Sequence, residues 1–239
     1  MPHQKKIVLS IIIPVYNEEK TIDKVIDKVK KVKLAPNIVK EIIVIDDGST
    51  DNSRQKIIRK KQLDRKNLKV HFSLINLGKG AAVRVGLKFA KGDLIIIQDA
   101  DLELDPKDHR KIIEPIIKGE AKVVYGSRFL SPNPNIPQKT RLANWFLTTL
   151  VNLLYGSHLT DMETAYKAFA AKTIKPIRLR ALEFEFEPEI TCQLLNQGTA
   201  IMEVPIKYRP RTKNEGKKIN FIHGIEAIYT IFKIKYAKT

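Results

Sequence analysis

Two aspartates, Asp99 and Asp101, are the residues whose types and spacing point most clearly to chemistry. They follow a short apolar run, residues 94–97. In extended chain, side chains two residues apart point the same way, so both carboxylates can face one ligand. Two carboxylates at one point repel each other unless a cation lies between them, and Mg2+ or Mn2+ takes such oxygen ligands together with substrate phosphates. The pair therefore predicts a metal site, in which Glu103 is either a third ligand or a solvated acid.

Two more apolar runs, residues 7–13 and 41–45, also lead into polar side chains. The residues that follow them include Pro14, Tyr16, Glu18, Asp46 and Asp47. A single acidic run end can be a helix cap, and capping explains residues 49–51 best, because Ser, Thr and Asp accept hydrogen bonds from the free N–H groups at a helix start. Three such run ends are harder to explain by capping alone. They predict one ligand site shared by three segments.

The apolar runs and the segments between them predict the fold. The runs of Ile, Val and Leu are residues 7–13, 41–45, 70–75, 94–97 and 121–125. Continuous apolar runs of this length suit parallel strands that are buried on both faces. Helical periodicity occupies the intervening segments 21–32, 53–64, 81–90 and 106–118. This alternation predicts a doubly wound α/β sheet, in which ligands bind beyond the carboxyl ends of the strands.

The second half of the chain has a different character. Residues 131–139 contain three prolines and predict an irregular loop. The apolar stretch 142–155 is shorter than the roughly 20 residues that span a bilayer, so it is either a core helix or an interfacial membrane helix. Residues 200–208 predict another strand. In the C-terminal segment 216–239, apolar residues recur at helical spacing among lysines, which indicates a basic amphipathic helix that lies on a membrane or packs on the domain.

Charge is the unusual total of this sequence. The 239 residues include 43 Lys and Arg against 26 Asp and Glu, for a formal net charge of +17. Such a field favours nucleic acid, phosphate-rich ligands or an anionic membrane, although lysine-rich solvated helix faces give the same total. A nucleic-acid-binding protein is disfavoured, because three acidic run ends repel a phosphate backbone. The single Cys192 and the short polar start at residues 1–6 indicate a cytoplasmic protein without disulfides.

The ordered motifs of the chain resemble a known family. PVYNE, DDGSTD, NLGKGAAVRVG, DADLELDP, YGSRF and TDMETAYKAF occur in that order. They are similar to family 2 of the GT-A glycosyltransferases, and more narrowly to the dolichyl- and polyprenyl-phosphate mannosyl- and glucosyltransferases. The resemblance covers about residues 7–215. It implies a GT-A catalytic domain over residues 1–215, with a mostly parallel central sheet flanked by helices, and an acceptor loop and apolar helix near 129–156.

The resemblance also implies roles for individual residues. The donor, GDP-mannose or UDP-glucose, is assigned to Pro14, Tyr16, Glu18, Asp46, Asp47, Lys79, Asp99, Arg211, Lys213 and Lys217. The metal, Mg2+ or Mn2+, is assigned to Asp99, Asp101 and Glu103. Mannosyltransferases of this type often have Gln where this chain has Glu103, so the departure leaves the donor open, with GDP-mannose favoured by the single-domain layout. For any one cation of the segment 208–218, a solvated surface charge is an equally good interpretation.

Two arginines are expected to bind the acceptor. Arg128 and Arg141 resemble residues that receive the acceptor phosphate, which a planar guanidinium suits, although each can instead pair with a surface carboxylate. With Asp99 and Asp101, Arg128 forms the expected catalytic set. A phosphate acceptor is already anionic near neutral pH and needs no strong base. The expected function is therefore inverting transfer of a hexose, mannose or glucose, to dolichyl or polyprenyl phosphate at the cytoplasmic face of a membrane.

One alternative reaction stays open at this point. A family 2 enzyme that acts on a hydroxyl of a glycan or protein needs a carboxylate to take the proton of that hydroxyl. Asp161, Glu163 and the glutamates of the FEFEPEI segment are the candidates, and one of them would then be essential. The five histidines form no ligand spacing and are expected to be structural or exposed.

Overall fold

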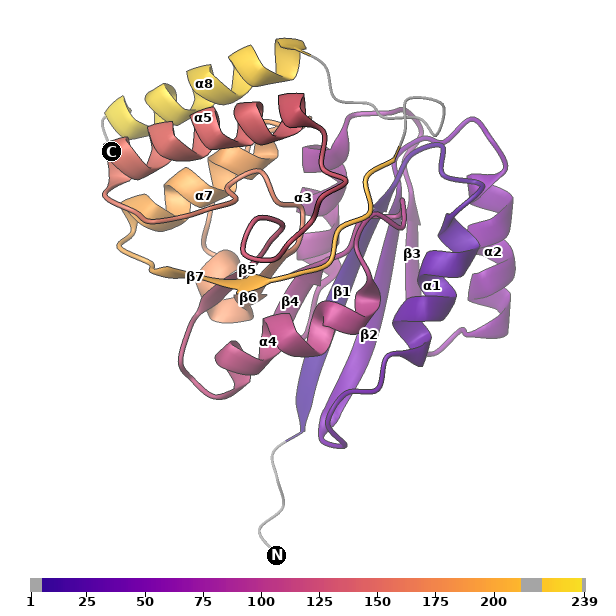
Figure 1. The fold of residues 1–239 in the computed structure, drawn as a ribbon. Coiled ribbons are helices and arrows are strands. Elements are labelled where there is room, and N and C mark those ends of the chain that lie inside the picture. The colour runs from indigo at the N-terminus through magenta and orange to yellow at the C-terminus, as the bar shows by residue number, and fades with distance from the viewer. Residues whose placement is uncertain (1–5, 212–220, 238–239) are drawn as a thin grey trace, which may run out of the picture.

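One seven-stranded sheet forms the centre of the molecule (Figure 1). The computed structural model of the chain describes residues 6–211 and 221–237. The strands are β1 (Ile7–Val15), β2 (Ile38–Asp46), β3 (Leu68–Phe72), β4 (Leu94–Ile97), β5 (Val123–Ser127), β6 (Lys167–Ala170) and β7 (Ile201–Pro205). Their order in the sheet is β3-β2-β1-β4-β6-β5-β7. Neighbouring strands pair in parallel except for β6, which is antiparallel to both β4 and β5. The predicted mostly parallel α/β sheet is therefore confirmed.

Helices cover both faces of this sheet. They are α1 (Ile22–Lys31), α2 (Ser53–Leu63), α3 (Lys79–Phe89), α4 (His109–Ile117), α5 (Gln138–Tyr155), α6 (Ala171–Ile174), α7 (Phe186–Asn196) and α8 (Phe221–Tyr236), with the 3-10 turn η1 (Pro106–Asp108) before α4. On one face, Ile11 of β1 belongs to a core cluster that includes residues of α1 and α4. On the other face, Ile12 belongs to a cluster with residues of α3 and α7. Alternate residues of one strand thus enter two cores, which is why the strand sequences are apolar without interruption.

A third core cluster joins the last helix to the rest of the molecule. Val151 of α5, Cys192 of α7 and Ile231 of α8 are buried together in it. Figure 1 shows α5 and α8 lying side by side, with α7 beneath them. Within the segment 216–239, the structure describes the helix Phe221–Tyr236, and one of its faces packs on the domain.

One predicted strand ends too late, one strand was not predicted, and one predicted loop contains the start of a helix. The third strand ends at Phe72, not at Ile75, because its neighbour β2 ends at Asp46, which is the register partner of Phe72. Beyond that point no adjacent strand is there to pair with, and Ile75 is 63% exposed in a loop. Sequence reasoning also missed β6, whose four residues are too few to show a period. In addition, α5 begins at Gln138, inside the segment that was expected to be a loop.

Candidate active site

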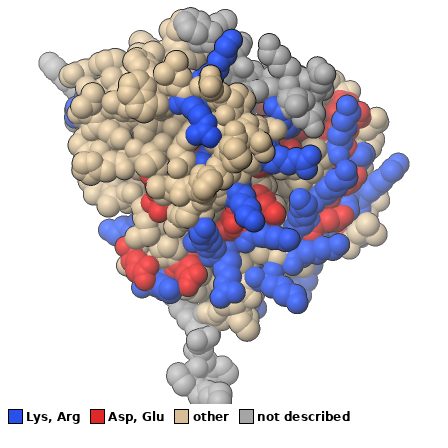
Figure 2. Space-filling model, in the orientation of Figure 1, with Lys and Arg blue, Asp and Glu red and all other residues tan. Residues whose placement is uncertain are grey.

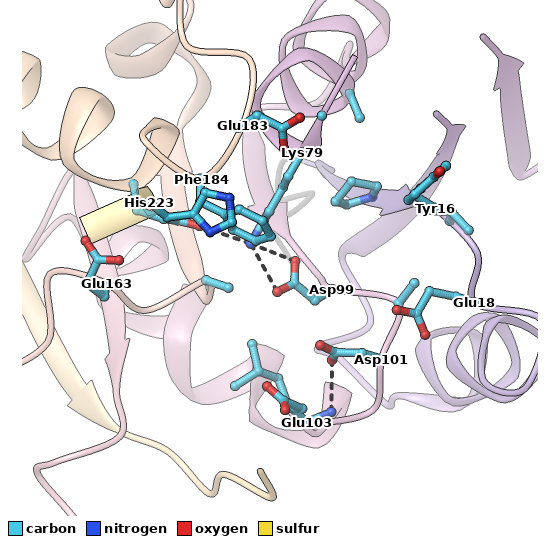
Figure 3. Close-up of a pocket in the computed structure, with 18 of the residues that line it drawn as sticks. Tyr16, Glu18, Lys79, Asp99, Asp101, Glu103, Glu163, Glu183, Phe184 and His223 are labelled. Carbon is cyan, nitrogen blue, oxygen red and sulfur yellow. Dashed lines mark hydrogen bonds and ion pairs between the residues drawn. The ribbon is translucent and has the colours of Figure 1, made fainter. Parts of the chain in front are cut away.

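A cavity of about 550 Å³ lies beyond the carboxyl ends of β1 and β4. Ten of the predicted site residues line it, namely Pro14, Tyr16, Glu18, Asp47, Lys79, Asp99, Asp101, Glu103, Arg128 and Arg211. The remaining lining residues include Thr140 of α5 and His223 of α8, so the cavity extends from the sheet edge to the two apolar helices. Figure 3 shows the acidic residues of the loop after β4 at the centre of this space, with Tyr16 and Glu18 on one side and Glu163 on the other.

Asp47, the residue after β2, holds the turn that begins α3. The carboxylate of Asp47 accepts hydrogen bonds from the backbone N–H groups of Leu77 (3.1 Å) and Gly78 (2.6 Å). Gly78 has a φ of 102°, and a Cβ at this position would lie 2.5 Å from the carbonyl oxygen of Leu182. Glycine is therefore required both by the backbone conformation and by the close approach of another chain segment. The turn fixes the position of Lys79 at the start of the helix.

Asp46, the last residue of β2, does not line the cavity. Side chains alternate along a strand, so Asp46 and Asp47 point in opposite directions. Asp46 is fully buried, and the Nε and Nη2 atoms of Arg54 each lie 3.1 Å from its Oδ2 atom. It is not among the described residues that line the cavity. Its role as a base- or ribose-binding residue thus stays a prediction, and in this structure its carboxylate stabilises the sheet edge through Arg54.

A chain of alternating charges runs from the cavity into the core. The Nζ atom of Lys79 lies 3.0 Å from Asp99 and 3.0 Å from Glu187, and Glu187 also accepts a hydrogen bond from the buried Lys167. Burial lowers the pKa of Lys79, but the carboxylates of Asp99 and Glu187 outweigh it and raise the pKa above its ordinary value. Burial raises the pKa of Asp99. Lys79 is therefore a fixed cation at the edge of the cavity.

The other carboxylates of the acidic loop share one guanidinium. The Nη1 atom of Arg211 lies 3.0 Å from Glu18, and its Nη2 atom lies 3.1 Å from Asp101. The backbone N–H of Arg211 donates to Oε1 of Glu103 at 2.7 Å. Burial, together with the charges of Asp99 and Glu103, raises the pKa of Asp101 to about 7. These carboxylates stand close enough to disfavour one another's charge.

The acidic loop has the donor chemistry of a divalent-cation site. Asp99, Asp101 and Glu103 offer only oxygen atoms, which Mg2+ and Mn2+ prefer, and one or two carboxylates suffice when substrate phosphates supply further ligands. Burial, together with repulsion from neighbouring carboxylates, raises the pKa values of Asp99 and Asp101. Within residues 6–211 and 221–237, no group of three acids, histidines or cysteines is arranged to hold a metal. Asp99 and Asp101 fit a metal shared with a ligand rather than one held by protein alone.

Arg128 is a further lining residue of the cavity. Its Nε atom lies 2.7 Å from Oδ2 of Asp161, and its Nη2 atom lies 2.7 Å from Oδ1. The backbone N–H of Arg128 also donates to Oδ2 of Asp161 at 2.9 Å. The guanidinium lies 5.3 Å from the centre of the Tyr208 ring. Burial lowers the pKa of Arg128, but Asp161 outweighs it and raises the pKa. The bidentate pair holds one cation at a fixed place in the cavity wall.

Arg141 is held by backbone carbonyl groups. Its Nη2 atom donates to the carbonyl oxygen of Asn133 at 2.6 Å, and its Nε atom donates to that of Ile136 at 3.3 Å. It does not belong to the described lining of the cavity. Because these bonds tie the proline-rich loop to the start of α5, its expected contact with an acceptor phosphate stays a prediction. Lys213 and Lys217 lie outside the described residues.

Glu163 is a cavity residue with unusual surroundings. Its Oε1 atom is buried and has no hydrogen-bond partner among the described residues. Burial, together with repulsion from Glu187, raises its pKa to about 7. By contrast, Asp161 is bonded to Arg128, and Glu187 lies between two lysines. Of the acids considered as bases, Glu163 is the one whose carboxyl group faces the cavity with a pKa near neutrality.

Sequence reasoning missed part of the lining. His223 and Phe184 contribute rings whose centres are 4.8 Å apart, and Glu183 lies beside them (Figure 3). His223 was not expected to line the cavity. The local sequence gave no signal, because His223 reaches the cavity only through the packing of α8 on α5 and α7.

Comparisons with known proteins identify the family of the chain. The family model described as Glycosyl transferase family 2 matches residues 10–183. The chain is 30% identical over 247 residues to a UDP-N-acetylglucosamine–dolichyl-phosphate N-acetylglucosaminyltransferase of Methanococcus voltae, covering 95% of this chain and 96% of that protein. It is 25% identical to a dolichyl-phosphate beta-glucosyltransferase of Trichomonas vaginalis, covering 95% and 72% of the two chains.

A solved structure has the same fold. Glucosyl-3-phosphoglycerate synthase from Mycobacterium tuberculosis, in complex with UDP, superposes with a TM-score of 0.75 and 20% identity, covering 98% of this chain and 82% of that one. This likeness shows the GT-A fold and no more, since the identity is low. The family match covers most of the chain, and one relative of almost the same length is 30% identical. The chain belongs to glycosyltransferase family 2.

Proposed function

We propose that this glycosyltransferase moves a hexose from a nucleotide-sugar to dolichyl or polyprenyl phosphate at a membrane surface. One observation carries the proposal. A single cavity contains the acidic loop after β4, an arginine held by Asp161, and residues from two helices whose outer faces are apolar. With a divalent cation on the acidic loop, this cavity would suit an anionic donor, an anionic acceptor and a lipid chain.

The residues divide between donor and acceptor. Asp99 and Asp101 would hold Mg2+ or Mn2+, which supplies positive charge to the departing nucleoside diphosphate. Lys79 lies beside Asp99 and adds a second positive charge at that end of the cavity. Arg128 positions the acceptor phosphate, because its guanidinium is held in one orientation by Asp161.

The reaction needs no general base on this proposal. An oxygen of the acceptor phosphate attacks the anomeric carbon while the bond from that carbon to the diphosphate oxygen breaks, with inversion. The second pKa of a phosphate monoester is about 6, so near pH 7 the attacking group is already largely a dianion. This agrees with the surroundings of Asp161 and Glu187, whose carboxylates are occupied by arginine and lysine side chains.

The outer faces of α5 and α8 support a membrane location. Their exposed apolar and aromatic residues are Leu142, Trp145, Phe146, Leu153, Ile225, Tyr229, Phe232 and Tyr236. In Figure 2 the upper left of the molecule, where α5 and α8 lie in Figure 1, shows few charges, whereas Lys and Arg gather to the right and below. Exposed Trp and Tyr are typical of protein surfaces at the membrane–water interface. None of the described helices is long and apolar enough to cross a bilayer.

The relatives suggest several candidate sugars rather than one. The two relatives act, by their names, on N-acetylglucosamine and glucose, and the first is a UDP-sugar enzyme that matches this chain over nearly its whole length. The expectation of GDP-mannose has no support among these relatives. UDP-N-acetylglucosamine, UDP-glucose and GDP-mannose are therefore all donors to be tested.

The test is transfer of label from each donor into organic-extractable polyprenyl phosphate. Each reaction runs with Mn2+ or Mg2+, and a parallel reaction contains EDTA. We expect a lipid product from one donor that EDTA abolishes. Absence of lipid product from every donor, with metal-dependent nucleotide binding retained, would overturn the lipid-phosphate proposal.

A second candidate has one observation in its favour. If the acceptor is a hydroxyl group, Glu163 is placed to take its proton, because its carboxyl lines the cavity, has a pKa of about 7 and leaves Oε1 without a described partner. Glu163→Gln distinguishes the two reactions. It would abolish transfer to a hydroxyl and leave transfer to a phosphate within a fewfold of the wild type.

A further inference from the structure

Arg211 occupies the space between carboxylates that come from two separate loops. Glu18 follows β1, whereas Asp101 and Glu103 follow β4. Three nitrogens of Arg211 contact them, since Nη1 lies 3.0 Å from Glu18, Nη2 lies 3.1 Å from Asp101 and the backbone N–H lies 2.7 Å from Glu103. Nε is 3.9 Å from Glu103. The side chain is 17% exposed, so this contact is partly shielded from water.

The same carboxylates include those expected to hold a divalent cation. A guanidinium is a permanent cation, and it offsets one of the three negative charges of this cluster. A guanidinium does not draw carboxylate oxygens as close as a coordinated metal ion does. The pKa of Asp101 stays raised beside Arg211. Lys79 has the corresponding position at Asp99. Both aspartates of the predicted metal pair are therefore already paired with protein cations.

We infer that Arg211 is an internal counter-ion, which occupies the acidic loop in the free protein and moves to the donor diphosphate when a divalent metal enters. The inference rests on the proposed function only in requiring a nucleoside diphosphate and a metal. Arg211 competes with the metal for Asp101 and Glu103, but it cooperates with the metal in binding a diphosphate. Metal and nucleotide must then increase each other's affinity, because the diphosphate offers Arg211 another anion.

This double role predicts effects of opposite sign for one substitution. In Arg211→Met, the acidic loop loses its internal cation, so Mn2+ binds more tightly in the absence of nucleotide. The same variant loses a contact to the diphosphate, so UDP or GDP binds less tightly in the presence of Mn2+. A residue that merely supports the fold would weaken both kinds of binding.

The experiment measures the free Mn2+ concentration by electron paramagnetic resonance, with and without UDP or GDP. The proteins are the wild type, Arg211→Met, Arg211→Lys and the control Arg209→Met, which removes an exposed cation two residues away. We expect wild-type Mn2+ binding to tighten about tenfold or more with the matching nucleotide, within the range usual for coupled ligands. Arg211→Met should bind Mn2+ severalfold more tightly alone and show a smaller coupling than the wild type. The coupling that remains comes from direct coordination of Mn2+ by the diphosphate. Arg211→Lys keeps the charge but has one side-chain nitrogen in place of two that contact the cluster, so it should fall between the wild type and Arg211→Met, and Arg209→Met should be unchanged.

Two results would overturn the inference. One is an Mn2+ affinity of Arg211→Met without nucleotide that is equal to or weaker than that of the wild type. The other is the same gain in Arg209→Met, which would indicate a general effect of net charge. Neither result depends on the acceptor, so failure of the lipid-transfer assay leaves this measurement valid. The converse also holds, because lipid transfer can be observed whatever the resting place of Arg211.

Discussion

Two arginines of the cavity are held in different ways. Arg128 is paired with one carboxylate, that of Asp161, through two side-chain bonds of 2.7 Å, and the carboxylate is fully buried. Arg211 is shared among Glu18, Asp101 and Glu103 at distances of 3.0 to 3.9 Å. We call these the fixed pair and the shared cluster. The fixed pair keeps a cation in one place whatever is bound, whereas the shared cluster holds a cation that another cation can replace.

The largest predicted effect concerns the stability of the fixed pair. Asp161→Asn leaves Arg128 buried without its counter-charge, and removing one partner of a buried pair costs about 3–5 kcal/mol. Urea unfolding should show a loss of this size. The control is Asp64→Asn, which breaks a partly exposed ion pair with Lys30 and should cost less than about 1 kcal/mol. Equal losses in the two variants would contradict the distinction between the fixed pair and ordinary surface pairs.

The next effect concerns chemistry at the shared cluster. Asp101→Ala removes a carboxylate proposed to hold the metal, and we expect the turnover number to fall at least about 100-fold, or about 2.7 kcal/mol in activation free energy. The protein should stay folded, because the variant relieves repulsion among Asp99, Asp101 and Glu103. Asp105→Ala is the control, since Asp105 caps the η1 turn and does not line the cavity. Activity of Asp101→Ala within tenfold of the wild type would exclude the proposed metal role.

A smaller effect depends on pH and on Glu163, which lies near the fixed pair. The pKa of Glu163 is about 7 in the folded protein, above its ordinary value of 4.5, so the folded state binds more protons between these two pH values. The free energy of unfolding should therefore fall as pH rises from about 4.5 to 7, by on the order of 2 kcal/mol from this group.

Glu163→Gln isolates that contribution. Asp101 titrates in the same window, so only the difference between the wild type and Glu163→Gln is informative. Relative to the wild type, the variant should gain stability as pH rises from 5 to 8. Glu114→Gln, at an exposed ion pair, is the control and should show no such trend. Parallel stability curves for the wild type and Glu163→Gln would mean that burial does not hold the carboxyl protonated.

The smallest predicted effect is on the stability of Arg211→Met. The side chain of Arg211 is 17% exposed, and the carboxylates around it can take up protons or water when it is removed, so its loss should lower the free energy of unfolding by less than the loss of Asp161 does. The comparison with Asp161→Asn in the same urea experiment tests the difference between the two arginines directly. A loss for Arg211→Met as large as that for Asp161→Asn would show that Arg211 is also a fixed structural cation.

Much of the fold was predictable because its central strands are buried on both faces. Continuous apolar runs located β1, β2 and β4 to within a few residues, and the helical periods located α1 and α2. Strand β6 escaped, since a four-residue strand within TDMETAYKAF has no readable period and owes its place to pairing between β4 and β5. The helix α7 also escaped, although its residues Ile190 and Leu194 belong to a core cluster.

The site was predictable where local chain geometry decides it. Asp99 and Asp101 could be found from their position after an apolar strand, and the ordered motifs pointed to Arg128 and Lys79. Partners could not be found in this way, because they depend on long-range packing. Glu187 lies 108 residues from Lys79, and Arg211 lies 193 residues from Glu18. No local pattern states that these side chains meet, and the same is true of His223.

The most direct test of the proposed reaction compares two acceptors that differ by one phosphate. Labelled sugar from the active donor is offered to polyprenyl phosphate and to polyprenol, with wild-type protein and with Glu163→Gln. The proposal predicts label in the phosphate lipid alone, at rates within a fewfold of each other for the two proteins. Label in polyprenol that disappears in Glu163→Gln, with none in polyprenyl phosphate, would contradict it and would establish a hydroxyl-directed reaction with Glu163 as the base.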